Sequence, residues 1–303
     1  MNKTNMPEFL AKMLVEQYGT KISEKIIEGY NINRFTTFRV NTLKTDIHSI
    51  EQKLIEADIE YEKVKWSKEA FIIKNDYKRK IENMDIYENG KIYFQSLSSM
   101  LPPIILEPKQ GEDILDMAAA PGGKTTQIAA ITKNKANITA CEMNGVRTER
   151  LKYNVEKQGA KCVYIMKTDS RKIDDFFSFD RILLDAPCSG SGTINLNDVN
   201  LQKKFTENLI NKTISSQLAL LKKAIKILKP GKEMIYSTCS ILSCENEEII
   251  RKALTGTKAE IVQIKFEGME TLPLLPTKIK GTICICPDKL YEGFFVAKIR
   301  KNM

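Results

Sequence analysis

The chain has 303 residues, of which 42% are hydrophobic and 28% charged, and its formal net charge is +9. It has no run of 18 apolar residues, no signal-peptide core and only scattered cysteines, which predicts a cytoplasmic protein without a disulfide framework. The single histidine, His48, excludes Ser-His-Asp hydrolases and histidine-rich zinc enzymes, and the charge favours a polyanionic partner over a merely lysine-rich surface.

The first part of the chain predicts helices followed by a small α+β module. Residues 6–30 predict two amphipathic helices that end at Gly19 and Gly29. The module that follows has roughly sixty residues, and its strand, helix and two further strands are expected at 35–42, 47–54, 61–64 and 70–73.

Several basic and aromatic side chains of this module permit two interpretations. They could form a face that binds nucleic acid by stacking and phosphate contacts, or the aromatic residues could belong to the core. The residues concerned are Arg34, Arg39, Lys44, Tyr61, Lys65 and Trp66.

Residues 90–100 join this module to a second one, and Pro102-Pro103 predicts a break before the next helix. Apolar strands then alternate with helical segments, which is typical of a parallel sheet covered on both faces. The strands are expected at 113–117, 138–142, 162–166, 181–185, 233–237, 282–286 and 294–299, and the helices at 125–131, 146–158, 202–228 and 245–254. The predicted domains are 1–94 and 95–303.

The second module is organised around residues 113–130, which read as a strand, a Pro-Gly-Gly turn and a helix. A phosphate-binding loop would need a glycine where Ala118 stands, so a nucleoside lying over small residues fits better than a triphosphate. The next strand ends in Glu142, an acid placed to hold ribose hydroxyls. Together these features predict S-adenosylmethionine as the cofactor.

Reactive side chains follow the later strands, where parallel sheets carry their ligands. Asp169 follows the third strand, Asp185-Ala186-Pro187-Cys188 the fourth, and Ser237-Thr238-Cys239-Ser240 the fifth. Cysteines within strands are usually inert, whereas Cys188 and Cys239 are expected in functional loops. No metal site is predicted.

These segments resemble the RNA 5-methylcytosine methyltransferases, a family that includes the bacterial 16S rRNA enzymes and the eukaryotic Nop2/Sun proteins. The paired Pro-Cys and Thr-Cys segments make the resemblance specific, and it covers roughly residues 35–303. The matching segments are FRVNTLK (38–44), QSLSSMLPP (95–103), DMAAAPGGKT (116–125), DRILLDAPCSGSGT (180–193), KPG (229–231), YSTCSI (236–241), ENEE (245–248) and YEGFFVAK (291–298).

The resemblance implies an α/β class I methyltransferase fold, with a mostly parallel seven-stranded sheet and helices on both faces, plus a small N-terminal RRM-like module that binds RNA. It implies that Cys239 is the nucleophile, that Cys188 assists product release, that Asp185 contacts the cytosine edge and that Lys124 supports catalysis. Glu142 would bind the ribose, Arg147 would support that site and Asp169 would meet the adenine. The remaining cofactor-binding residues would be Ala118, Ala119, Ala120, Pro121, Gly122, Gly123, Lys124 and Asp185.

The resemblance further implies an RNA substrate, with ribosomal RNA favoured over transfer RNA, and a monomer without a membrane or an obligate protein partner. Two other functions remain open. A DNA cytosine-5 methyltransferase would use Cys188 as its nucleophile, and a catalytically inactive RNA scaffold would bind the cofactor without turnover.

Overall fold

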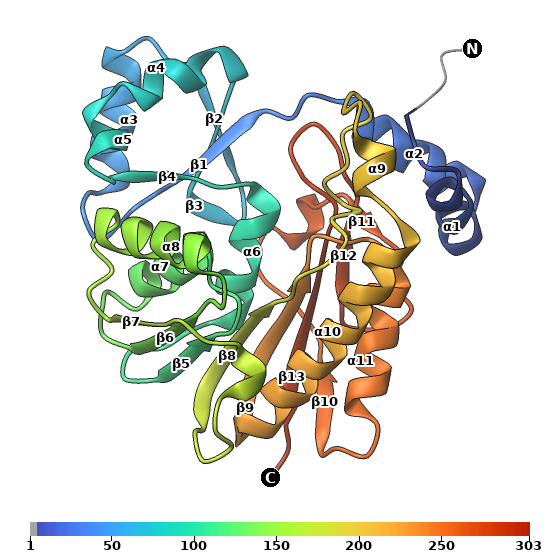
Figure 1. The fold of residues 1–303 in the computed structure, drawn as a ribbon. Coiled ribbons are helices and arrows are strands. Elements are labelled where there is room, and N and C mark those ends of the chain that lie inside the picture. The colour runs from blue at the N-terminus through green and yellow to red at the C-terminus, as the bar shows by residue number, and fades with distance from the viewer. Residues whose placement is uncertain (1–4) are drawn as a thin grey trace.

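The computed structural model of the chain describes residues 5–303, so the first four residues of the predicted N-terminal domain lie outside it. The chain forms a large sheet with helices on both faces and a smaller four-stranded sheet beside it (Figure 1). In the part of the chain that the structure describes, no helix is both long and apolar enough to cross a bilayer.

Five parallel strands form one side of the large sheet, in the order β9-β8-β5-β6-β7, with β7 at the edge. They are β5 (Asp113–Asp116), β6 (Asn137–Cys141), β7 (Val163–Met166), β8 (Phe179–Asp185) and β9 (Leu228–Thr238). The chain runs outward from β5 to β7 and then returns to place β8 on the other side of β5. The carboxyl ends of β5 and β8 therefore flank the point where the strand order reverses, which is where such sheets bind ligands.

Antiparallel strands complete the sheet beyond β9, and they are β10 (Ala259–Val262), β11 (Leu274–Leu275), β12 (Ile283–Ile285) and β13 (Phe294–Lys301). The predicted fold class is confirmed, and the sheet has nine strands where seven were expected. The added strands are β10 and β11, with four and two residues. Segments this short show no recognisable alternation of apolar and polar residues. They form strands only because a neighbouring strand is there to pair with them.

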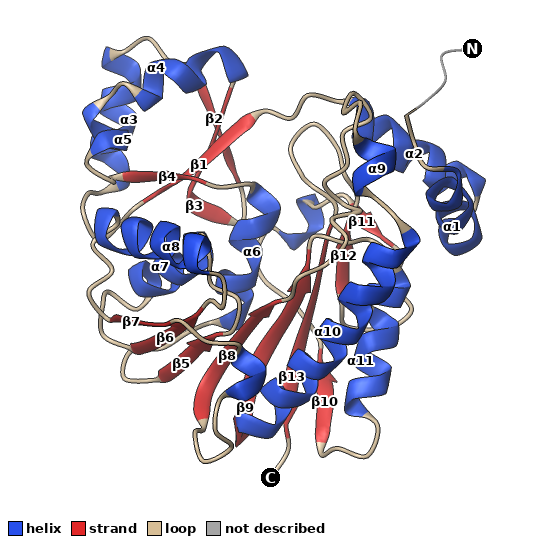
Figure 2. Ribbon diagram, in the orientation of Figure 1, coloured by secondary structure: helices blue, strands red, loops and turns tan. Residues whose placement is uncertain are grey.

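Helices cover both faces of the large sheet (Figure 2). One face packs on α6 (Leu97–Leu106), α7 (Gly123–Ile131) and α8 (Gly145–Lys157). The other packs on α9 (Leu201–Lys204), α10 (Glu207–Ile227) and α11 (Glu247–Leu254). Ile114 and Leu115 point to opposite faces, because successive strand residues alternate. The single helix expected at 202–228 is two helices in the structure, α9 and α10.

The small sheet has the antiparallel order β2-β3-β1-β4, with β1 (Thr36–Val40), β2 (Tyr61–Val64), β3 (Ser67–Ile73) and β4 (Ile92–Phe94). One face packs on α3 (Ile47–Glu56), α4 (Lys78–Glu82) and α5 (Asp85–Glu88). On the other face, Ala70 and Ile72 join the core of the large module. Neither face of the small sheet is therefore free.

The two N-terminal helices, α1 (Glu8–Tyr18) and α2 (Thr20–Asn31), pack into the core of the large sheet. The predicted boundary at Gly19 is confirmed. The boundary at Gly29 is wrong, since this residue lies inside α2. A Cβ atom there would come within 2.0 Å of the carbonyl oxygen of Pro287. Glycine at this position therefore allows the backbone of α2 to pack closely against Pro287.

The predicted break at Pro102-Pro103 is also wrong, because both residues lie within α6. Pro103 has no N–H to donate to the carbonyl of Ser99, four residues before it. The side-chain amide of Gln95 donates to that carbonyl at 3.0 Å and supplies the missing hydrogen bond. Eight of the ten residues of α6 are buried, so packing outweighs the low helix propensity of proline.

Candidate active site

The glycine loop joins the end of β5 to the start of α7, and small residues with unusual backbone angles form it. The Asp116 side chain holds both ends, accepting from the Thr125 hydroxyl at 2.7 Å and the Ala118 N–H at 3.4 Å. Gly122 has a φ of 109°, which favours glycine, and a Cβ on Gly123 would lie 3.0 Å from the Tyr93 ring. The loop thus leaves open space above small side chains.

Glu142 and Arg147 form the next wall of the site, as the sequence indicates. Glu142 follows β6 and is only 4% exposed, with Oε1 accepting from the Asn144 N–H at 2.8 Å. The Arg147 Nε lies 3.4 Å from Glu142 Oε2, and its Nη2 donates to the Ala120 carbonyl at 2.8 Å. Arg147 therefore ties the acid to the glycine loop.

Asp169 follows β7, and its carboxylate is engaged by a residue that the sequence analysis missed. Arg171 donates from Nε and Nη2 to the two Asp169 oxygens at 2.9 and 2.6 Å. The Arg171 hydrogen bond lowers the pKa of Asp169. In the sequence, Asp169 and Arg171 look like part of an ordinary polar turn. Only their position directly after β7 could have indicated that Arg171 belongs to the site.

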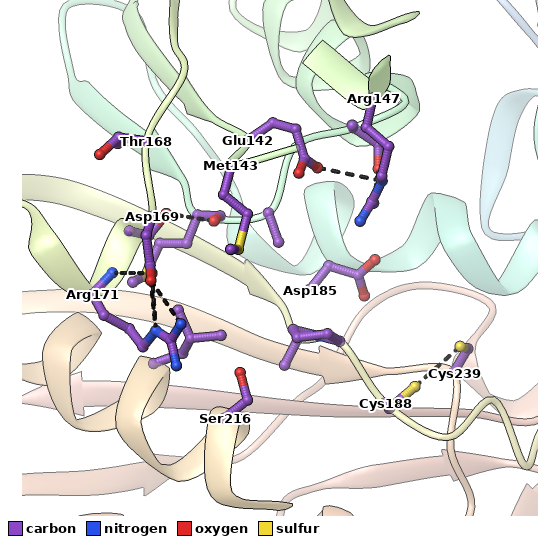
Figure 3. Close-up of a pocket in the computed structure, with 17 residues that line it drawn as sticks. Glu142, Met143, Arg147, Thr168, Asp169, Arg171, Asp185, Cys188, Ser216 and Cys239 are labelled. Atoms are coloured by element: carbon purple, nitrogen blue, oxygen red, sulfur yellow. Dashed lines mark hydrogen bonds and ion pairs between the residues drawn. The ribbon is translucent and has the colours of Figure 1, made fainter. Parts of the chain in front are cut away.

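These groups surround a cavity of about 290 Å³ (Figure 3). Figure 3 shows Asp169 and Arg171 on one side, the two cysteines on the other, and Asp185 between them. The lining includes Met117, Ala118, Ala120, Glu142, Met143, Arg147, Thr168, Asp169, Ser170, Arg171, Asp185, Ala186, Pro187, Cys188, Ser216, Leu220 and Cys239. Of these, Met143, Thr168, Ser216 and Leu220 had no motif to identify them in the sequence.

A second cavity of about 310 Å³ lies between the small module and the same strand ends. Its walls include Tyr93 and Phe94 from the small module, and Gln95, Lys124 and Phe294 from the large one. The two cavities share four lining residues, which are Ala118, Ala120, Asp185 and Cys239. A ligand in one cavity therefore lies next to a ligand in the other.

Asp185 ends β8 and has hydrogen-bond donors on both of its oxygens. Lys124 Nζ lies 2.6 Å from Oδ2, and the Ser237 hydroxyl donates to Oδ1 at 2.7 Å. Lys124 also donates to the Ser99 hydroxyl at 2.7 Å. Burial alone would lower the pKa of Lys124, but the charge and hydrogen bond of Asp185 outweigh it and the pKa is raised. The lysine is thus held as a cation.

The two rim cysteines meet at the border of both cavities, with their sulfur atoms 3.1 Å apart. The hydrogen bond to Cys239 and then burial raise the pKa of Cys188 well above its ordinary value, and the charge of Glu245 adds to this. Either sulfur could be the hydrogen-bond donor in this contact, and the raised pKa of Cys188 keeps that residue in its thiol form.

Of the six basic and aromatic residues for which two interpretations were open, Arg39 and Trp66 are buried, whereas Lys44 and Lys65 are exposed. Trp66 is 7% exposed and its indole N–H donates to the Tyr291 hydroxyl at 2.8 Å. Arg39 is 3% exposed, with Nε donating to Gln95 at 2.9 Å and Nη2 to the Thr126 hydroxyl at 2.7 Å. Lys44 donates to backbone carbonyls of Asn89 and Lys157. Of the two interpretations, the structure favours the interior one for Trp66 and Arg39.

The family model described as 16S rRNA methyltransferase RsmB/F matches residues 103–300 of this chain. The chain belongs to the RsmB/F methyltransferase family. A model of the RsmF/B-like ferredoxin-like domain also matches residues 6–79. The identification made from the Pro-Cys and Thr-Cys segments is therefore confirmed, and the small module is the family's ferredoxin-like domain.

Curated relatives in this family differ in length and in the RNA that their names specify. A probable ribosomal RNA small subunit methyltransferase B from Bacillus subtilis is 31% identical over 99% of this chain and 67% of its own length. A tRNA (cytosine(49)-C(5))-methyltransferase from Pyrococcus abyssi is 35% identical over 96% of both chains. The crystal structure of a methyltransferase homologue from Pyrococcus horikoshii has a TM-score of 0.82 and 32% identity, covering 98% of this chain and all of the other.

Proposed function

We propose that this chain transfers a methyl group from S-adenosylmethionine to C5 of a cytosine in RNA, through a covalent bond between Cys239 and C6 of the base. The observation that carries the proposal is the meeting of two cavities at Asp185 and Cys239. One cavity has the size and the carboxylate acceptors expected of a nucleoside site, and the other faces the ferredoxin-like domain. A cofactor and a base could then react across the shared border.

The residues of the first cavity fit S-adenosylmethionine. Ala118 and Ala120 leave room that larger side chains would fill, and the Glu142 and Asp169 carboxylates offer acceptors at separate points of the wall. We assign Glu142 to the ribose hydroxyls, with Arg147 supporting it, and Asp169 to the adenine end. When bound, S-adenosylmethionine supplies a methyl group on a positively charged sulfur.

In the second cavity, Cys239 would add as a thiolate to C6 of the cytosine. This addition moves the electron pair of the C5–C6 double bond toward C5, which otherwise is a poor nucleophile. Asp185 and Lys124 would hold the N3/N4 edge, where charge changes during the addition. Their mutual distance of 2.6 Å keeps both groups at the border of the cavities before substrate arrives.

Release reverses the addition after methyl transfer. A water molecule takes the proton from C5, the electrons of that C–H bond re-form the double bond, and the C6–S bond breaks. The departing electron pair returns to the sulfur of Cys239. Cys188, which keeps its proton, would stabilise this leaving thiolate through the hydrogen bond seen at 3.1 Å.

Denaturing gel electrophoresis of each cysteine variant with labelled RNA tests the roles of the two sulfurs. Cys239→Ala should lose turnover and form no covalent complex, because no other side chain is assigned to activate C5. Cys188→Ala should form a slowly migrating covalent complex, since attack remains possible and release fails. The opposite pattern would make Cys188 the nucleophile, as expected of a DNA cytosine-5 methyltransferase. If the wild-type protein neither forms a covalent complex with any RNA nor methylates it, the chain is an inactive scaffold.

The substrate is structured RNA, and the target cytosine must leave its stack to reach Cys239. Ribosomal RNA is our first choice, and the 35% identity to a tRNA (cytosine(49)-C(5))-methyltransferase supports transfer RNA as the second. Bisulfite sequencing of total RNA from a deletion strain decides between the two classes. We further propose that the enzyme is a cytoplasmic monomer whose two functional domains are residues 1–94 and 95–303.

A further inference from the structure

Glu245 carries a buried carboxylate at the end of η3 (Ser243–Glu245), close to the candidate site but outside both cavities. The residue is 0% exposed. Its side-chain oxygens accept hydrogen bonds from neutral donors. The donors are the Ser189 N–H at 2.8 Å, the Ser189 hydroxyl at 2.5 Å, the Thr213 hydroxyl at 2.7 Å and the Gln217 amide at 3.4 Å.

These donors connect the Cys188 loop to helix α10. Ser189 directly follows Cys188, whereas Thr213 and Gln217 lie on α10. Gln217 also donates to the carbonyl of Pro187 at 3.0 Å. The residues on both sides of Cys188 are thus fastened to one helix, and Glu245 provides two of the acceptors in this network.

Removing a carboxylate from water costs free energy, so a buried one needs compensating contacts or a role in function. Hydrogen bonds to an ionised acceptor are shorter and stronger than neutral ones, which makes the loop rigid. The same negative charge contributes to the raised pKa of Cys188. Both effects favour one arrangement, in which a protonated Cys188 stays within 3.1 Å of the sulfur of Cys239.

We propose that Glu245 is a positioning residue that fixes Cys188 as the protonated partner of Cys239, and so controls the rate at which the covalent RNA adduct is released. This role rests on the function proposed above, in which Cys239 attacks and Cys188 assists release. Glu245 itself touches neither the RNA base nor the cofactor cavity. Its influence passes through Ser189 and through its charge.

Glu245→Gln is the variant of choice, because it removes the charge and keeps the side-chain length. We expect a covalent adduct that persists about tenfold longer than in the wild type, with kcat lowered by the same factor and KM for RNA unchanged. Methyl transfer in the first turnover should remain.

Glu247→Gln is the matched control, since Glu247 is 3% exposed and accepts from the Lys278 N–H, away from Cys188. It should release RNA at the wild-type rate. In a Cys188→Ala background, Glu245→Gln should add nothing, because both changes act on one step. If Glu245→Gln releases RNA at the wild-type rate, the role of Glu245 is overturned. The same holds if Glu245→Gln slows release in the Cys188→Ala background by the same factor as in the wild type. Absence of any adduct in Cys188→Ala itself would instead overturn the proposed function.

Discussion

Lys124 Nζ lies 2.6 Å from Asp185 Oδ2, and Ser237 occupies the other oxygen of the same carboxylate at 2.7 Å. The ion pair links the start of α7 to the end of β8, on the two sides of the strand-order reversal. The side chains are 14% and 26% exposed, so the charges are only partly screened by water. A base entering the second cavity meets this pair already formed, which limits reorganisation during the reaction.

Asp185→Asn and Lys124→Met should each lower kcat about 100-fold or more, because either change removes a charge placed at the edge of the reacting base. Cofactor affinity should change far less. Radiolabelled methyl transfer and calorimetry measure the two quantities. Lys229→Met serves as the control, since Lys229 pairs with Asp180 and lines neither cavity. Near-normal turnover of Asp185→Asn would remove Asp185 from the mechanism.

Glu142→Ala should weaken binding of S-adenosylmethionine about tenfold or more through lost ribose hydrogen bonds. Calorimetry with the cofactor or its demethylated product measures this. Glu149→Ala provides the comparison, because Glu149 is exposed and pairs only with Lys152 on the same helix. Equal affinities of the two variants would mean that the ribose lies elsewhere.

Mild oxidation should inactivate the enzyme reversibly. The Cys188 and Cys239 sulfurs are 3.1 Å apart, so a small movement allows them to form a disulfide as hydrogen peroxide is reduced to water. Activity should return on addition of dithiothreitol, and peptide mapping should show the 188–239 link. Irreversible loss, or a link at the buried Cys284 or Cys286, would contradict this expectation.

Gly192→Ala should destabilise the protein by about 2–3 kcal/mol and disturb the Cys239 loop. A Cβ atom at Gly192 would lie 1.9 Å from the Gly293 carbonyl oxygen, and the Gly192 N–H donates to the Cys239 carbonyl at 2.9 Å. Thermal unfolding and turnover measure both effects. Gly145→Ala is the control, because its added methyl would meet only the flexible end of Lys167. A neutral Gly192→Ala would show that the two loops can separate.

Asp116→Asn should flatten the pH dependence of stability. Burial raises the pKa of Asp116 from 3.8 to about 6, so the folded state holds this proton more tightly than the unfolded chain does. The wild type should therefore lose stability as pH rises from about 4 to about 6, on the order of 3 kcal/mol from this group. Denaturant unfolding across that range, compared between the two proteins, measures the difference. If the free energy of unfolding falls equally with pH in both proteins, a group other than Asp116 is responsible for the titration.

The strand ends were predictable because local pattern and sheet topology agree there. Apolar runs ending in Asp185 and Cys239 place both residues at one edge of a parallel sheet, and the pairing of β8 with β9 brings them together. The glycine loop was recognisable for a similar reason, since its backbone angles demand particular residues. Both inferences needed only local pattern and the regular pairing of parallel strands, with no knowledge of particular side-chain contacts.

Several missed features depend on side-chain contacts between distant segments. The helix through Pro103 persists because Gln95 replaces the lost donor, and Gly29 lies in mid-helix because Pro287 packs against it. Glu245 was visible in the ENEE segment, yet its importance comes from Ser189, 56 residues away. Trp66 and Arg39 looked suited to RNA until the large module covered them.

The helices at the start of the chain hold the loops that complete the active site. The Tyr18 hydroxyl donates to the Ile241 carbonyl at 2.6 Å, two residues after Cys239, and the Tyr30 hydroxyl donates to the Ser191 carbonyl at 2.5 Å. During synthesis, α1 and α2 emerge from the ribosome long before either carbonyl exists. Their apolar residues Leu10 and Ile26, each 0% exposed in the finished fold, must wait for the far end of the chain. The first helices therefore cannot dock until the catalytic loops have been translated, and the apolar faces of α1 and α2 stay uncovered in that interval, which exposes the nascent chain to aggregation.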